Sequence, residues 1–196
     1  LVAPEGGESH TKPTEPSDLE KSTKITNSVE SKRFEEYIRK SLKKPNGELT
    51  QEDFDKIKSI YFRHSTLDDI SIVSKMRNLE SFDIADAEKV SDLSPLKGHT
   101  KLKRLLVQEN NISDISVLTN LTELEEVYLW SNPIEDISPL LGLKKLKVID
   151  IRTTKVSLQN VEKLKKAFPY SIFYHPHMNT DEKWTTHMRD KLKQTT

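Results

Sequence analysis

The chain has 196 residues, enough for one domain with a substantial hydrophobic core. Its 31 basic and 31 acidic side chains cancel, so the chain as a whole does not attract nucleic acid or an anionic membrane. Cysteine is absent, which excludes disulfides, thiolate catalysis and thiolate metal sites. No apolar run approaches the roughly 20 residues that span a bilayer, so we expect no transmembrane segment. Partners must therefore be recognised by local shape and chemistry.

Residues 1–29 are rich in Pro, Glu, Ser, Thr and Lys and contain almost no large apolar side chain. Such a segment cannot bury enough surface to offset the entropy of ordering, so we interpret it as a flexible leader or tether. Residue 1 is Leu rather than Met, which fits either a removed signal peptide or a trimmed chain.

Residues 30–56 predict two short helices. Phe34, Ile38 and Leu42 recur at the spacing of one helical face, and Thr50 has the side chain of an N-cap for the second helix. We expect this segment to be an N-terminal cap, because the first coil of a repeat array has an open apolar end that must be covered.

Residues 57–156 carry an apolar phrase with a period of 22 residues. Its clearest copies open at Leu102, Leu124 and Leu146, and weaker copies open at Ile57 and Leu79. This period is typical of leucine-rich repeats, in which each unit is a short strand and a return segment. The sequence thus predicts an α/β fold, namely a right-handed leucine-rich repeat solenoid of about five coils with helical caps and a short parallel sheet on its concave face.

Asn110 and Asn132 occupy the position where each coil turns inward. A buried amide there can hydrogen-bond backbone groups of the neighbouring coil, so we predict a structural role for both residues. Ser65 and Thr154 replace the asparagine in the terminal units. The spacing between Leu79 and the next opening is one residue longer, which predicts a bulge within residues 85–89 that is either tolerated or bends the sheet beside its concave rim.

The return segments share an Asp-Ile/Leu-Ser phrase whose acidic residue recurs with the repeat and suits the cap of a single helical turn. Its members are Asp69, Asp92, Asp114 and Asp136. The extended phrase Asn-x-Ile-x-Asp-Ile-Ser-x-Leu resembles the internalin type of bacterial leucine-rich repeat. Residues 43–50 resemble the helical cap that precedes such repeats. The resemblance implies a secreted or surface-attached binding module of the adhesin or virulence-factor type. We expect no cofactor.

Residues 157–175 predict a C-terminal cap, with Ser157 as the N-cap of a closing helix and residues 170–174 as a further extended segment. In the tail, residues 176–196, Trp184, Met188 and Leu192 recur at helical spacing. This helix either folds back over the cap or binds a partner or a second copy of the chain.

The side chains that point away from the core on each strand form the concave face. Two rows result, namely Tyr61, Asp83, Leu106, Tyr128 and Asp150, and beside them Arg63, Ala85, Gln108, Trp130 and Arg152. Arg104, Glu126, Glu109 and His64 flank these rows. Tyr128 and Trp130, bordered by arginines, form the combination that interface hot spots favour. Alternatively, Trp130 only covers its neighbours.

We predict that a protein or peptide ligand contacts this face. The predicted partner-binding residues are Tyr61, Arg63, Arg104, Leu106, Gln108, Tyr128, Trp130, Asp150 and Arg152. The histidines at 175 and 177 lack a fixed carboxylate partner, so we expect no metal site. Phosphate-loop and nucleophile motifs are missing, so we do not expect an enzyme. An intracellular scaffold or enzyme inhibitor and a self-assembling structural module remain alternatives.

Overall fold

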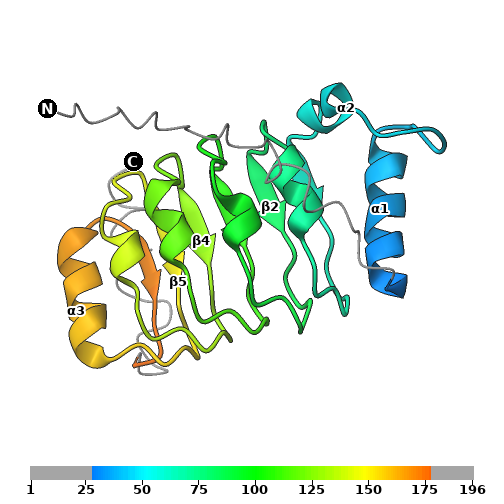
Figure 1. The fold of residues 1–196 in the computed structure, drawn as a ribbon. Helices are drawn as coiled ribbons and strands as arrows, with labels where there is room; N and C mark the ends of the chain where they lie inside the picture. Colours follow the sequence, from blue (N-terminus) through cyan, green and yellow to red (C-terminus); the bar gives the residue numbers. More distant parts are fainter. Residues whose placement is uncertain (1–27, 178–196) are drawn as a thin grey trace, which may run out of the picture.

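The computed structural model describes residues 28–177 as an open solenoid with one strand per coil. Six parallel strands form one sheet in chain order, which confirms the predicted fold class. They are β1 (Ser59–Tyr61), β2 (Ser81–Asp83), β3 (Arg104–Leu106), β4 (Glu126–Tyr128), β5 (Val148–Asp150) and β6 (Ile172–Tyr174). Helix α1 stands at one end of the array and α3 at the other (Figure 1).

The strands are aligned so that equivalent residues of the repeat lie side by side. Ile60, Phe82 and Leu105 are successive register partners, and Val127 and Ile149 continue the row. All five side chains are at most 1% exposed. The ladder is apolar in every coil because each of these positions points into the space between the sheet and the return segments.

The return segments contain the 3-10 turns η1 (Ser71–Lys75), η2 (Ser94–Leu96), η3 (Ser116–Asn120) and η4 (Ser138–Leu140). The aspartate of each return phrase accepts a hydrogen bond from the backbone N–H two residues later. For Asp114 the Oδ1–N distance to Ser116 is 2.8 Å. The same bond recurs in the other coils, at 2.7–2.8 Å. The predicted capping role of the repeated aspartates is thus confirmed, with the aspartate one residue before the N-cap position.

Asn132 hydrogen-bonds backbone groups of the neighbouring coil. Its Nδ2 donates to the carbonyl of Val107 in the neighbouring coil at 2.8 Å, and its Oδ1 accepts from the amide of Ile112 at 2.9 Å. Asn110 also donates to the neighbouring coil, to Ile84 O at 3.2 Å, but its buried Oδ1 has no partner. In the coil before it the equivalent position is Ala87, which is fully buried and has no amide.

The additional residue of the long repeat lies beyond the end of β2. The β2–β3 register is continuous from Ser81 to Asp83, so the insertion does not interrupt the sheet. Asp86 and Glu88 both adopt left-handed backbone conformations, with φ of 57°. The insertion therefore acts as the predicted bulge, and it is absorbed in the turn that leaves the concave face.

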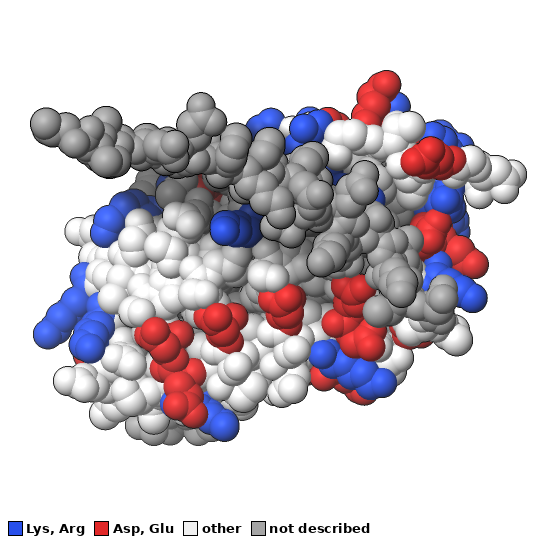
Figure 2. Space-filling view, viewed as in Figure 1, with Lys and Arg blue, Asp and Glu red and all other residues white. Residues whose placement is uncertain are grey.

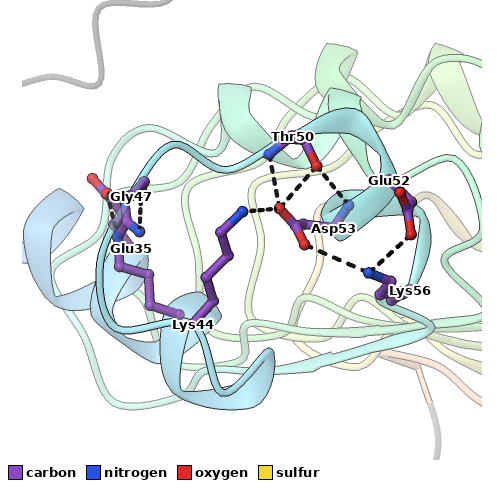
Figure 3. A network of polar contacts seen from close by, with 8 residues as sticks. Glu35, Lys44, Gly47, Thr50, Glu52, Asp53 and Lys56 are labelled. Carbon is purple, nitrogen blue, oxygen red and sulfur yellow. Dashed lines mark hydrogen bonds and ion pairs between the residues drawn. The ribbon is translucent and has the colours of Figure 1, made fainter.

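The N-terminal helices are α1 (Val29–Ser41) and α2 (Gln51–Asp55). Thr50 caps α2 as predicted: its hydroxyl accepts a hydrogen bond from the Asp53 amide, and the Asp53 carboxylate accepts one from the Thr50 amide, which completes a capping box. The Asp53 carboxylate also forms an ion pair with the ammonium of Lys44, which lies in the loop that follows α1 (Figure 3). The Oδ2–Nζ distance is 2.6 Å. These contacts keep the pKa of Asp53 well below its usual range, first through the hydrogen bond from Lys44. One carboxylate thus joins the inter-helix loop to the second helix.

The C-terminal end is closed by α3 (Leu158–Ala167) and β6. Ser157 accepts a hydrogen bond from the Asn160 amide, which confirms the predicted N-cap, and Val161 and Leu164 are fully buried. The expected extended segment is β6, which pairs with β5. Residues 1–27 of the predicted leader and residues 178–196 of the predicted tail lie outside the described residues. The last two residues of the predicted leader belong to the cap instead, since Ser28 is the N-cap of α1 and Val29 is its first residue.

Candidate partner-binding face

The outward side chains of the strands form two rows across the concave face. The register places Tyr61 beside Asp83, and continues through Leu106 and Tyr128 to Asp150. β6 extends this row by one residue that sequence reasoning missed, Tyr174. The sequence could have identified Tyr174, because residues 170–174 were expected to be extended and the outward position of that segment falls on Tyr174. The second row begins two residues later in each coil.

Arg152 organises the C-terminal part of this face. Its Nε and Nη2 donate to the two carboxylate oxygens of Asp150, at 2.9 and 2.6 Å. Its guanidinium also lies over the rings of Trp130 and Tyr174, at 5.8 and 5.2 Å from their centroids. Asp150 is only 2% exposed, so it acts on the surface by holding Arg152 rather than by presenting its own oxygens. The planar guanidinium suits this combination of forked hydrogen bonds and ring stacking.

Tyr128 lies between this cluster and a second ion pair. Arg104 and Glu126 are register partners on β3 and β4, and their side chains approach to 3.2 Å. Burial raises the pKa of the Tyr128 hydroxyl, with a further contribution from Glu126. The phenol therefore stays protonated at neutral pH, and it keeps both its hydrogen-bond donor and its apolar ring in the half-buried face.

The N-terminal part of the face repeats the arginine–aspartate–tyrosine motif. Arg63 donates through Nε and Nη2 to the Asp83 carboxylate at 2.7 and 2.5 Å, and its guanidinium lies 4.8 Å from the Tyr61 ring centroid. Asp83 is 4% exposed, whereas Tyr61 is 61% exposed. This end therefore also has an arginine held in one orientation beside an accessible aromatic ring.

Between these two ends, the two rows carry smaller side chains without charge. Ala85, Leu106 and Gln108 are at most 9% exposed. The Gln108 Oε1 is buried without a hydrogen-bond partner. The predicted site residues are thus separated into two aromatic–arginine clusters, one at each end, with a shallow apolar and amide surface between them.

A rim of strained backbone borders the second row. The residue directly after the second row has φ between 53° and 57° in each coil, and these residues are His64, Asp86, Glu109, Ser131 and Thr153. Each left-handed residue costs about 1 kcal/mol, so neighbouring coils must support the conformation. Two such contacts are the His64–Asp86 pair, at 2.5 Å, and the hydrogen bond from Ser131 N to Thr153 Oγ1, at 2.9 Å. Periodicity alone did not reveal this rim, because the residues are chemically dissimilar.

Within residues 28–177, no group of three or more potential metal ligands converges. His177 donates its amide to His175 Nδ1 at 3.2 Å, and its own ring contacts Val156 O at 2.9 Å, so both histidines have structural contacts. None of the described helices is both long enough and apolar enough to cross a bilayer. In the view of Figure 2, basic and acidic side chains are interspersed with uncharged surface.

The family model for leucine-rich repeats in two copies matches residues 100–141 and 122–166. A solved internalin (inlF) of Listeria monocytogenes superposes with a TM-score of 0.57 and 25% identity, covering 70% of this chain and 48% of that one. The chain is an internalin-like leucine-rich repeat protein. It spans about half the length of that internalin.

Two further solved structures share the fold of this internalin-like protein. Internalin C2 (inlC2) of Listeria monocytogenes has a TM-score of 0.55 at 24% identity, over 68% of this chain and 70% of that one. A leucine-rich repeat protein of Leptospira interrogans has a TM-score of 0.55 at 18% identity, over 65% of this chain and 34% of that one. No curated protein sequence matches the chain significantly. The internalin-like fold is that of a protein-binding module.

Proposed function

We propose that this internalin-like protein is a non-enzymatic binding module of a bacterial surface or secreted protein, of the adhesin or virulence-factor type. It binds a protein or peptide through its concave face. The observation that carries the proposal is the cluster of Trp130, Tyr128 and Arg152. The Arg152 guanidinium is held by the buried Asp150 carboxylate and lies over the rings of Trp130 and Tyr174. The resemblance to internalins supports the extracellular setting.

Preorganisation is the physical reason to favour this cluster. A free arginine side chain loses about 2 kcal/mol of rotamer entropy when it is fixed by a ligand. Arg152 is already fixed by Asp150, so most of that cost falls on folding rather than on binding. Its side chain nevertheless remains 46% exposed. A ligand therefore meets an ordered cation between two aromatic rings, which is the composition of an interface hot spot.

The size of the sheet limits the ligand. Six strands about 4.8 Å apart, each showing about four residues at roughly 3.3 Å rise, present an area well below the ~800 Å² per partner of a standard interface. A peptide segment fits on the sheet alone, whereas a folded partner must also contact the rim or the caps. Both kinds of ligand would cover the two aromatic–arginine clusters.

The test is capture of host-cell and extracellular-matrix proteins by the immobilised full chain. A Tyr128→Ala, Trp130→Ala variant with an unchanged circular dichroism spectrum should fail to retain the proteins that the wild type retains. The matched control replaces two exposed apolar residues outside the face, Val29→Ala and Leu158→Ala, and should retain them. Equal retention by all three chains would place the binding surface elsewhere.

A further inference from the structure

A hollow of about 420 Å³ lies where the N-terminal helix meets the first strand. It lies beyond the N-terminal end of the concave sheet, away from Trp130. The α1 side contributes Arg33, Glu36, Tyr37 and Lys40, and the β1 side contributes Tyr61, Phe62, Arg63 and His64. Its volume is within the range of pockets that hold small ligands or single side chains of a partner.

The floor of the hollow is aromatic and rigid. The Phe62 ring lies 5.5 Å from that of Tyr37 in an edge-to-face arrangement. The Tyr37 hydroxyl accepts a hydrogen bond from the Tyr61 amide at 2.9 Å, which fixes the helix against the strand. The Tyr61 ring stands at the edge and is 61% exposed. An apolar group that entered the hollow would therefore contact ring surface that is already ordered.

The rim of the hollow carries more positive than negative side chains. Lys40 is exposed and has no ion-pair partner among residues 28–177, which the structure describes. Arg33 lies over the Phe62 ring at 5.3 Å, and within the described part of the chain its guanidinium hydrogen-bonds through Nη1 alone, to Glu30 at 3.3 Å. Arg63 uses Nε and Nη2 on Asp83, which leaves Nη1 available.

Glu36 is the one carboxylate in the lining. Free N–H donors on three cations above an aromatic floor match an anion that carries an apolar group. A carboxylate gains charge-assisted hydrogen bonds from such donors, and its apolar neighbour gains ring contacts.

We propose that this hollow binds a side-chain carboxylate of a partner polypeptide, with the apolar side chain next to it held against Tyr37, Tyr61 and Phe62. Lys40 is the residue most available to pair with the carboxylate, since no acidic side chain of residues 28–177 forms an ion pair with it. The inference extends the proposed binding face onto the helical cap and names the chemistry accepted there. It does not require the Tyr128–Trp130 cluster to bind.

The probe is the blocked dipeptide N-acetyl-Glu-Phe-amide, titrated into the ¹⁵N-labelled full chain and followed by amide chemical shifts. We expect saturable shifts at Lys40, Tyr61 and Arg63. The neutral analogue N-acetyl-Gln-Phe-amide removes only the charge, and a Lys40→Gln variant removes its partner; each should weaken binding about fivefold or more. Glu36→Gln should strengthen binding, because it removes the like charge.

Lys32→Gln is the matched control, since Lys32 is an exposed lysine of α1 that does not line the hollow, and it should bind as the wild type does. The Tyr128→Ala, Trp130→Ala variant should also bind the probe normally, which separates this site from the proposed function. The proposal is overturned if the shifts do not saturate, if the Glu and Gln probes bind equally, or if Lys40→Gln has no effect.

Discussion

The hydroxyl of Tyr37, on the first helix, accepts a hydrogen bond from the backbone amide of Tyr61, on the first strand, at 2.9 Å. The side chains of Ile60 in β1 and of Phe62, directly after β1, are buried, while the Tyr61 amide faces the free edge of the sheet. A parallel sheet otherwise leaves such an edge amide open to pairing with another chain. The cap thus closes the sheet by a specific polar contact as well as by apolar packing.

Replacing Tyr37 by Phe should lower the free energy of unfolding by about 1 kcal/mol, because it removes one hydrogen bond and keeps the ring. Amide hydrogen exchange at Tyr61 should become faster. Urea unfolding and exchange measured by NMR check both effects. Tyr174→Phe is the control, since the Tyr174 ring contact with Arg152 needs no hydroxyl. Unchanged exchange at Tyr61 would show that the bond does not protect the edge.

The two ladder asparagines should differ in their contribution to stability. Asn132→Ala removes the acceptor of the buried Ile112 amide and the donor to the Leu129 carbonyl, so it should cost about 3 kcal/mol. Asn110→Ala removes only donated bonds, because its Oδ1 is already unpaired, and it should cost about 1 kcal/mol less. Chemical denaturation of both variants measures the difference, and equal losses would contradict this account.

His99 is a polar residue in an apolar ladder. It is 2% exposed and occupies the position filled by Met76, Leu121 and Leu143 in other coils. Its Nε2 contacts Val73 O at 3.1 Å, but its Nδ1 is buried without a partner. His99→Leu should raise the free energy of unfolding by about 1 kcal/mol, because Val73 O keeps its bond from the Met76 amide.

The reverse change tests the same explanation. Leu121→His places an imidazole in the equivalent buried position of the next coil and should destabilise the protein by about 2 kcal/mol or more. Thermal unfolding followed by circular dichroism compares the two variants. A lower melting temperature for His99→Leu would mean that the histidine contributes a favourable interaction beyond the contact with Val73.

His175 predicts a dependence of stability on pH. Burial lowers the pKa of His175 to about 4, with a further contribution from Lys165. The unfolded chain, with a histidine pKa of about 6.5, then binds more protons than the folded chain between pH 6.5 and 4. The neutral imidazole therefore contributes stability above pH 6.5 that is lost as the pH falls, by about 2 kcal/mol between pH 7 and pH 5.

The matching variant is His175→Gln, which has a neutral acceptor but does not titrate. Urea unfolding at pH 7 and pH 5 should show a smaller loss of stability for this variant than for the wild type, with the difference close to the contribution of the one histidine. The same loss in both proteins would assign the acid sensitivity to other groups.

The repeat phrase predicted the solenoid, its strands and the burial of the ladder because the apolar period directly reflects one strand per coil. Ser157 and Thr50 could be identified as caps because capping is local in sequence. The bidentate Arg152–Asp150 pair is also local, only two residues apart, but its geometry depends on the Trp130 and Tyr174 rings in adjacent coils. Such lateral contacts need the three-dimensional register.

His99 shows a second limit of sequence reasoning. It lies at a repeat position that is otherwise apolar. Because of the preceding insertion, His99 follows its equivalent Met76 by 23 residues instead of the regular 22. The candidate face was predicted as a row of outward positions, whereas the structure divides it into two arginine–aromatic clusters. That division depends on which carboxylate each guanidinium meets, and side-chain pairing of this kind is not encoded in the period.

The most direct measurement is the dissociation constant of one captured partner for the wild type and for the Tyr128→Ala, Trp130→Ala variant. Biolayer interferometry at a single salt concentration is suitable. The account predicts at least a tenfold loss of affinity, equal to about 1.4 kcal/mol or more. Dissociation constants that agree within about twofold, a difference of only ~0.4 kcal/mol, would contradict binding through this face.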